Sequence, residues 1–290
     1  MTKIAILFFG LSKCLSKIIP SIKKHLFDVL SKNNIEFDIF IHTNKINGVY
    51  RNIWSGEDFS NYPNEDIESI LSPKYYLHDN QDDIIKKINI DEYTKNPGNW
   101  CGGFPIELTK ILIKNMFLAL YSKKRITEEF QKHKNEYDYA IITRPDSMFF
   151  KDINIDWFKE LNNNNIIIPS IDWYSGCNDR FCIGKPDVII YYGTLFNHLE
   201  RYLKSNKLCS EKYLLDMLNE KKINIIKKDI VYKKIRMSKN DTIKINGITL
   251  PDDFIPEIYK LLNKDLTKMN DNELKNHYLN FGIKEKRLYK

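Results

Sequence analysis

The hydrophobic pattern at the start of the chain predicts a strand, a helix and a second strand. Residues 3–9 (KIAILFF) form an apolar run without polar alternation, typical of a central parallel strand covered on both faces. Residues 15–30 then place apolar side chains at helical spacing, and 37–44 (FDIFIHTN) predict another buried strand. This order predicts an α/β fold with a mostly parallel sheet flanked by helices.

The middle of the chain continues the same alternation. Residues 107–133 predict the longest helix, and 137–150 predict a strand that must end or turn at Pro145, because proline cannot donate to a ladder. The face expected to be buried in that helix contains Leu108, Ile111, Leu112, Asn115, Leu118, Ala119 and Ser122. Further strands are predicted at 165–170, at 180–184 and once or twice within 223–237, with helices at 186–205 and 211–221. The segment 45–105 is weakly patterned; 74–79 reads as a strand and 96–105 as a loop rich in Gly and Pro.

The pattern changes near the end of the chain. Asn246-Gly247 is a strong signal for a tight hairpin. From Phe254 onward, short amphipathic helices follow, with Asn270 as an N-cap and Gly282 as a stop. We therefore expect two domains, a larger α/β domain at 1–250 and a small C-terminal helical module at 251–290.

Composition narrows the class of protein. Among 290 residues, 42% are hydrophobic and 13% aromatic, which is enough for a sizeable core and excludes wholesale disorder. The net charge of +7 comes mostly from lysine, and arginine clusters interleaved with aromatic residues are missing, so no nucleic-acid partner is expected. A basic cleft for an anionic ligand is compatible with this charge.

Targeting and metal signals are weak. No apolar run reaches the roughly 18–20 residues of a membrane span, and the first residues do not resemble a secretory signal, so we expect a cytoplasmic protein without a membrane span. Five cysteines form no CxxC pair, which argues against a zinc site and a disulfide framework. The motifs of nucleophile-elbow hydrolases and zinc peptidases are also missing.

The strongest candidate for chemistry is the triplet Arg144-Pro145-Asp146 at the end of the third strand. In open α/β sheets, ligands bind at the carboxyl edge. A carboxylate there can bind a divalent cation, and an arginine can pair with a diphosphate. We expect Asp146 to face solvent; the alternative is a structural Arg–Asp pair at a strand end.

Two loops offer further candidates. Residues 172–184 combine Asp172, Trp173, Asn178 and Asp179 before a short strand; the aromatic rings suit a sugar face or a base, and the polar side chains suit hydroxyl groups. The alternative is a turn capped by Asn178 and Asp179 with its aromatic residues in the core. The first loop, with Gly10, Ser12 and Lys13, joins a strand to a helix N-terminus, a place for a phosphate or a base, although it is not a P-loop.

Six segments follow one another along the chain: KIAILFFG, FDIFIHTN, YDYAIITRPD, NDRFCIG, SEKYLLDML and a late strand ending in KKIR. In this order they resemble a family of glycosyltransferase-like proteins with a GT-A-type fold, found in giant viruses and in bacterial surface-polysaccharide loci. The tail from residue 257 to 287 resembles a helical module appended to such enzymes. The resemblance covers most of the chain, with residues 45–105 the weakest part.

The resemblance implies a nucleotide-sugar donor, a glycan or glycoprotein acceptor, and often a divalent cation such as Mn²⁺ or Mg²⁺. It implies a donor site made of Gly10, Ser12, Lys13, Arg144 and Asp146, with Asp146 as the metal ligand, and acceptor or sugar contacts from His42, Asp172, Trp173 and Asn178. The family's usual Asp-x-Asp is Arg-Pro-Asp in this sequence, so Arg144 is expected to supply part of the charge that a metal would carry.

The catalytic base is expected to be a carboxylate, either Asp179 or Glu211. Asp179 is favoured because it precedes a buried strand and reaches the sheet edge, whereas Glu211 lies in the first turn of a helix, where the dipole alone favours an acid. Two alternatives to an enzyme stay open. One is a nucleotide- or sugar-binding protein of the same fold without turnover; the other is an interaction protein of a glycan-assembly complex.

Overall fold

The computed structural model describes residues 1–52, 57–60, 62, 64–94, 105–236, 244–245, 248–251 and 254–289. The chain forms two compact units, Met1–Met237 and Ser238–Lys290. The division after residue 250, expected from the sequence, stays a prediction. The loop predicted at 96–105 lies, apart from Pro105, outside the described residues.

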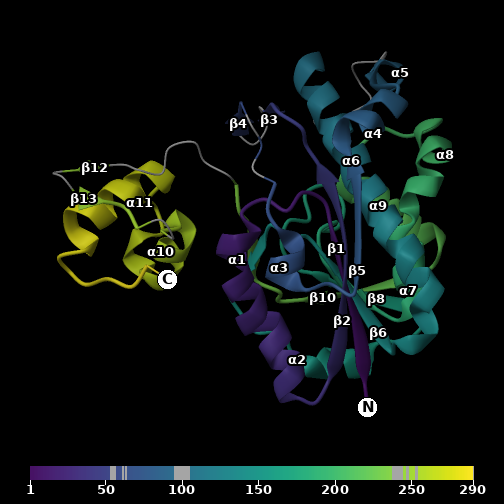
Figure 1. Cartoon of the computed structure of the whole chain (residues 1–290), viewed down its shortest axis with the longest axis horizontal. Helices are drawn as coiled ribbons and strands as arrows, with labels where there is room; N and C mark the ends of the chain where they lie inside the picture. Colours follow the sequence, from purple (N-terminus) through teal and green to yellow (C-terminus); the bar gives the residue numbers. More distant parts are fainter. Residues whose placement is uncertain are drawn as a thin grey trace. The chain divides into compact units, whose positions relative to one another are not determined.

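A seven-stranded sheet forms the centre of the larger unit (Figure 1), with the strand order β10-β8-β9-β6-β1-β2-β5. Its strands are β1 (Lys3–Phe9), β2 (Glu36–Lys45), β5 (Tyr75–Asn80), β6 (Tyr139–Thr143), β8 (Asn165–Pro169), β9 (Cys182–Gly184) and β10 (Asn224–Lys228). Neighbouring strands are parallel except at β9, which runs antiparallel to both β6 and β8. The predicted α/β class with a mostly parallel sheet is confirmed.

Strand β1 is buried on both faces, as its continuous apolar run predicts. Ala5, Leu7 and Phe9 belong to the main hydrophobic core on one face. On the other face, Phe8 meets Phe27 edge-on, with ring centroids 6.4 Å apart. Burial of both faces leaves only the strand ends for polar ligands.

Helices cover both faces of this sheet (Figure 1). On one face α1 (Leu15–Ile22) continues through a π-helical turn (Lys23–Phe27) into α2 (Asp28–Lys32). The other face is covered by α6 (Ile106–His133), α7 (Pro186–Gly193) and α9 (Ser210–Glu220). Shorter helices are α3 (Ile67–Leu71), α4 (Gln81–Lys87), α5 (Ile90–Thr94) and α8 (Leu199–Leu203), with 3₁₀ helices at Lys134–Glu136, Ile155–Glu160 and Leu195–His198.

The buried surface of α6 is wider than the sequence predicted. Leu112, Leu118 and Ser122 are buried as expected, but Leu108, Ile111, Asn115 and Ala119 are only partly buried. The helix packs against β1 and β2 and also against α5 and α7, so side chains beyond one stripe are enclosed. Lys123 and Thr127 are among these additional buried residues.

Pro145 ends the third strand as predicted. After β6 the chain turns, and β7 (Ser147–Phe149) leaves the central sheet to pair antiparallel with β11 (Tyr232–Lys234). Residues 223–237 therefore contain two strands rather than one. A second small antiparallel ladder joins β3 (Tyr50–Asn52) to β4 (Glu57–Phe59).

The unit Ser238–Lys290 has a hydrophobic core of its own that includes Phe254, Tyr259 and Tyr278. Its elements are β12 (Lys244–Ile245), β13 (Ile248–Thr249), α10 (Pro256–Leu262), a turn at Lys264–Leu266, α11 (Asp271–His277) and a π-helical turn at Tyr278–Gly282. The hairpin expected around Asn246-Gly247 is present as the antiparallel pair β12–β13, although the turn residues lie outside the described residues. Asn270 caps α11 in a reciprocal capping box with Glu273, as predicted. No helix in the described part of the chain is both long and apolar enough to cross a bilayer.

Candidate functional site

The carboxyl edge of the central sheet gathers most of the predicted site residues. Gly10 to Lys13 follow β1, and Arg144 to Asp146 follow β6, which lies next to β1. Because β9 is antiparallel, Asp179 and Arg180, which precede it, lie at the same edge as residues that follow the parallel strands. One reversed strand thus brings two distant loops to one place.

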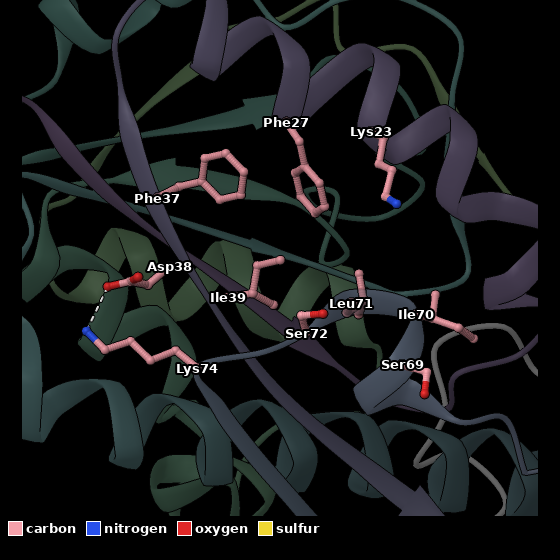
Figure 2. Close-up of a pocket in the computed structure, with 10 residues that line it drawn as sticks. All are labelled: Lys23, Phe27, Phe37, Asp38, Ile39, Ser69, Ile70, Leu71, Ser72 and Lys74. Atoms are coloured by element: carbon pink, nitrogen blue, oxygen red, sulfur yellow. Dashed lines mark hydrogen bonds and ion pairs between the residues drawn. The ribbon is translucent and has the colours of Figure 1, made fainter.

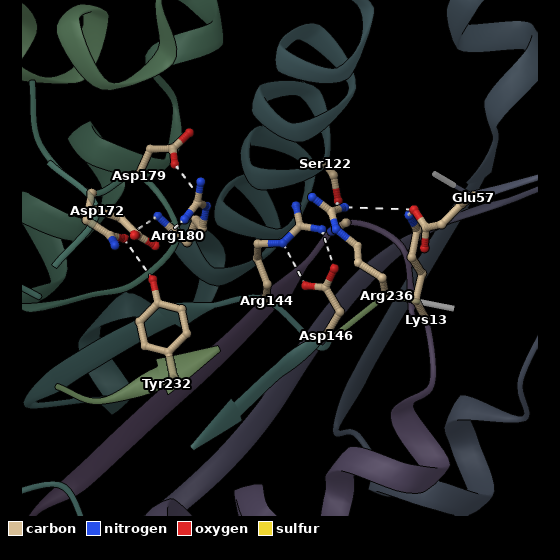
Figure 3. Close-up of polar contacts among 12 residues, drawn as sticks. Lys13, Glu57, Ser122, Arg144, Asp146, Asp172, Asp179, Arg180, Tyr232 and Arg236 are labelled. Atoms are coloured by element: carbon tan, nitrogen blue, oxygen red, sulfur yellow. Dashed lines mark hydrogen bonds and ion pairs between the residues drawn. The ribbon is translucent and has the colours of Figure 1, made fainter. Parts of the chain in front are cut away.

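Arg144 and Asp146 form a bidentate ion pair (Figure 3). Arg144 Nε donates to Asp146 Oδ1 and Nη2 donates to Oδ2, each at 2.7 Å. The carboxylate of Asp146 is 0% exposed and the Arg144 side chain 15% exposed, so the expectation that Asp146 faces solvent is wrong. Burial opposes ionisation of Asp146, but the charge and hydrogen bonds of Arg144 outweigh it, and the pKa lies below its usual value.

The turn after β1 is held by α6. Gly10 adopts a left-handed backbone conformation (φ +96°), and its N–H donates to Ser122 Oγ at 2.7 Å. A Cβ at this position would lie 3.3 Å from Arg144 Nη1, so glycine leaves room for the guanidinium group. Ser12 is buried in the same turn.

His42 is buried and both of its ring nitrogens are engaged. Nδ1 lies 2.7 Å from Ser122 Oγ, and Nε2 lies 3.1 Å from Asp79 Oδ2. Burial lowers its pKa to about 4, although the neighbouring Asp79 carboxylate opposes the shift. His42 thus helps to hold Ser122, which accepts from the Gly10 N–H, and so supports the turn after β1. Contact of His42 with a sugar stays a prediction.

Lys13 is buried beside a residue that the sequence did not single out. Its Nζ lies 2.5 Å from Glu57 Oε2 and 2.5 Å from the Tyr50 hydroxyl. Glu57 begins β4, and its side chain is fully buried. The β3–β4 ladder therefore closes over the loop that follows β1.

The last strand of the unit adds two more cations. Lys234 is paired in register with Ser147, and Ile235 N donates to the Asp146 carbonyl at 2.9 Å. Arg236 Nη1 lies 3.8 Å from Glu57 Oε2, and Figure 3 shows its guanidinium near that of Arg144. Burial and the nearby Arg144 charge lower the pKa of Lys234 to about 7.

Residues 172–180 form a loop with many internal contacts. Arg180 Nη1 lies 2.5 Å from Asp172 Oδ2, and Arg180 N donates to Asn178 Oδ1 at 3.0 Å. Asn178 is buried, accepts from the Tyr232 hydroxyl at 2.9 Å and donates to the Ile171 carbonyl at 3.1 Å. Asn178 thus holds the loop, as the capped-turn alternative expects.

Trp173 lies at the base of this loop. Its Nε1 donates to the Pro169 carbonyl at 2.5 Å, and Lys227 Nζ lies 3.7 Å from its ring centroid. Tyr174 is exposed instead. A stacking role for Trp173 stays a prediction, and in this structure one of its ring faces is covered by Lys227.

The two candidate bases, Asp179 and Glu211, are electrostatically coupled. Burial and the charge of Asp179 raise the pKa of Glu211. The loop that contains Gly176 packs closely against the start of α9. A Cβ on Gly176 would collide with the Glu211 carbonyl oxygen, which accepts a hydrogen bond from Cys177 N at 3.1 Å. The Asp179 carboxylate is 25% exposed, with Oδ1 3.8 Å from Arg180 Nε.

Lys123 supports Asp179 from α6. Its buried Nζ donates to the Asp179 carbonyl at 2.9 Å and to the Tyr192 hydroxyl at 3.3 Å. The ammonium also lies 4.7 Å from the ring centroid of Phe9. Lys123 therefore links the loop before β9 to the end of β1.

Several buried polar atoms near these strand ends have no hydrogen-bond partner within the described residues. They are Thr43 Oγ1, Asn44 Oδ1, Tyr62 OH, Thr143 Oγ1 and Ser147 Oγ. Unsatisfied buried polar groups are costly, and a bound polar ligand is one way to satisfy them. Their concentration around the carboxyl edge supports a ligand site there.

The donor set around Asp146 does not fit a divalent cation. Both carboxylate oxygens already accept from Arg144, and Lys13, Lys234 and Arg236 add positive charge around it. Across the described ranges, no three His, Cys, Asp or Glu side chains are grouped as metal ligands. Hard cations are bound mainly by carboxylate oxygens, and both oxygens of Asp146 already accept from Arg144 among further positive charges.

A separate groove lies away from this edge (Figure 2), with a volume of about 430 Å³. It is lined near the amino end of β2 by Phe37, Asp38 and Ile39, and by Phe27 and Lys74 from neighbouring segments. Lys74 Nζ lies 2.8 Å from Asp38 Oδ2. Because the groove is at the amino end of the strands, it is not part of the candidate site.

The sequence missed four residues of the site: Glu57, Lys123, Lys234 and Arg236. Glu57 lies in the weakly patterned segment, where a three-residue strand leaves no periodic signal. Lys123 lies about 100° around the helix from Ser122, outside the predicted buried stripe, and lysine is rarely buried, so the sequence contained no signal for it. Lys234 and Arg236 belong to the KKIR segment, whose position only the β7–β11 pairing reveals.

Comparisons with known proteins add little. No family model matches the chain, and no curated protein is similar to it. Among solved structures, ligand-free mouse xyloside xylosyltransferase 1 aligns with a TM-score of 0.38 and 9% identity, over 78% of this chain and 84% of that one. Similarity at this level is too low to support a family or an activity, so the function must be argued from the site.

Proposed function

We propose that this chain is a glycosyltransferase that transfers a sugar from a nucleotide-sugar donor to a glycan or glycoprotein acceptor. The observation that carries the proposal is one sheet edge where three basic side chains, those of Arg144, Lys234 and Arg236, lie next to two carboxylates. The carboxylates are Asp179 and Glu211, and the charge of Asp179 acts on both Glu211 and Arg144. The cations suit the diphosphate of a donor, and the carboxylates suit an acceptor hydroxyl. Gly10, Ser12 and Lys13 at the β1 turn complete the donor side.

The reaction needs a negative charge beside the acceptor hydroxyl and a positive charge beside the leaving diphosphate. As the acceptor oxygen attacks the anomeric carbon, it loses a proton to a carboxylate, and the bond from that carbon to the diphosphate breaks. The electron pair of that bond stays on the leaving diphosphate oxygen, whose new charge must be stabilised. In this proposal Arg144 performs the second task and Asp179 the first, with Glu211 as the second candidate base.

The test is a thermal-shift screen of the full chain with nucleotide-sugars and the corresponding nucleoside diphosphates, with Mn²⁺ or with EDTA. One base and sugar should raise the melting temperature in a saturable way. Saturable binding without transfer or hydrolysis would indicate a binding protein of the same fold. No shift with any nucleotide would favour an interaction protein and contradict the proposal.

A further inference from the structure

We propose that the donor diphosphate is bound by a metal-independent basic cluster formed by Arg144, Lys234 and Arg236, with Lys13 at its margin. This inference rests on the proposed function and adds Lys234 and Arg236 to its site. It also departs from the divalent cation that the sequence resemblance implies.

The geometry comes from the antiparallel pair β7–β11. Pairing of Lys234 with Ser147 and the hydrogen bond from Ile235 N to the Asp146 carbonyl fix the end of β11 alongside the Arg-Pro-Asp turn. Arg236 continues this path toward Glu57 (Figure 3). Two segments about ninety residues apart thus contribute cations to one place.

The cations of the cluster outnumber its carboxylates. Asp146 is paired with Arg144, and Glu57 with Lys13 and more distantly with Arg236. Lys234 is partly buried, and within the described ranges its ammonium forms no hydrogen bond or ion pair. The Asp146 carboxylate attracts this ammonium, but burial and the charge of Arg144 outweigh that attraction and lower the pKa of Lys234 to about 7. An anionic ligand beside Lys234 would stabilise its charged form.

Arg144 has donors left for a ligand. Asp146 accepts from Nε and from Nη2, whereas Nη1, which packs against Gly10, forms no hydrogen bond within the described residues. The bidentate pair fixes the guanidinium in place, so little reorganisation is needed when the leaving group gains charge. Fixed cations can thus perform the task that a metal performs in the related chemistry.

The experiment measures binding of inorganic pyrophosphate and of a panel of nucleoside diphosphates to the full chain by calorimetry, in EDTA and in Mn²⁺. Binding should be saturable in EDTA and no tighter in Mn²⁺, because Mn²⁺ also forms complexes with the free diphosphates. Lys234→Met and Arg236→Met should each weaken binding by about 10–100-fold, the effect of losing one charged hydrogen bond. Lys233→Met is the matched control, because neighbouring residues of a strand point to opposite faces, and it should change affinity little.

Stability gives an independent readout. Lys234→Met should not lower the melting temperature of the free protein, because it removes a cation without an ion-pair partner. Binding that requires Mn²⁺, or equal affinity in the Lys234→Met, Arg236→Met and Lys233→Met variants, would overturn the inference while leaving the proposed function standing. If no nucleoside diphosphate binds in either condition, the proposed function fails as well.

Discussion

At the residue scale, the central feature is a carboxylate that is more buried than its sequence position suggests. Asp146 follows a strand end, where side chains are commonly exposed, but β11 and the β1 turn close over it. Local pattern indicates where a strand ends and cannot reveal which distant segment covers that end. The Arg-Pro-Asp triplet was therefore identified correctly as a strand end and wrongly as an open one.

Asp146→Ala should destabilise the protein by about 3–5 kcal/mol, because it leaves Arg144 as an uncompensated, largely buried charge. Urea unfolding measures this change. The double variant Arg144→Gln/Asp146→Asn removes both charges and should be more stable than Asp146→Ala. A loss below about 1 kcal/mol for Asp146→Ala would show that the pair is not structural.

Asp179 and Glu211 can be separated by isosteric amides. Asp179→Asn should lower turnover by about 10²–10⁴-fold with donor binding intact, as expected for loss of a general base. Glu211→Gln should reduce turnover much less. The opposite order would assign the base to Glu211, whose pKa is raised by burial and by the charge of Asp179.

His42 should give stability a pH dependence of its own. Its pKa is about 4 in the folded protein and about 6.5 when unfolded, so the unfolded chain binds the proton first. Burial of neutral His42 therefore adds to the free energy of unfolding above pH 6.5. This stabilisation, about 3 kcal/mol in total, is lost as the pH falls toward 4. Urea titrations between pH 7 and 4 should show the free energy of unfolding falling more in the parent protein than in the His42→Gln variant. An equal pH dependence in the two proteins would contradict this prediction.

At the scale of elements, the central sheet was predictable from the sequence, but the pairing of the short strands outside it was not. Continuous apolar runs identified β1, β2 and β8, since strands buried on both faces must be apolar along their length. Strands β3, β4 and β11 have three residues each, and their partners lie far along the chain or in weakly patterned sequence. Glu57 and Lys234 lie in these short strands, and Arg236 follows two residues after β11. The sequence therefore did not reveal half of the basic cluster.

Gly176→Ala tests whether the close packing of the 172–180 loop against α9 positions the carboxylates of Asp179 and Glu211. A methyl group there would collide with the Glu211 carbonyl at the start of α9, so the loop and the helix must move apart. We expect turnover to fall at least tenfold while donor affinity changes little, because a displacement of about 1 Å can cost 10²-fold in rate. Gly184→Ala is the control, because the atoms nearest to its Cβ would belong to the side chains of Ile189 and Val188, at 3.3 Å and beyond, rather than to backbone. Equal turnover in the two variants would contradict the role of Gly176.

At the scale of the whole molecule, the larger unit contains every residue of the candidate site. A chain ending at Met237 should fold and bind nucleotide with the affinity of the full chain. A chain ending at Leu250 should be less soluble, because this leucine belongs to the core of the C-terminal unit and would be exposed. Circular dichroism, size-exclusion chromatography and nucleotide titration of both truncations check this, and loss of nucleotide binding in the shorter chain would place part of the site in the C-terminal unit.

The most direct measurement is release of nucleoside diphosphate from a panel of nucleotide-sugars by the full chain, followed over time in EDTA. We expect one donor to be turned over above the background rate, and the Asp179→Asn/Glu211→Gln variant to bind that donor without releasing diphosphate. Absence of release from every donor, with or without Mn²⁺ and with glycan acceptors present, would contradict the proposal that this sheet edge is the active site of a glycosyltransferase.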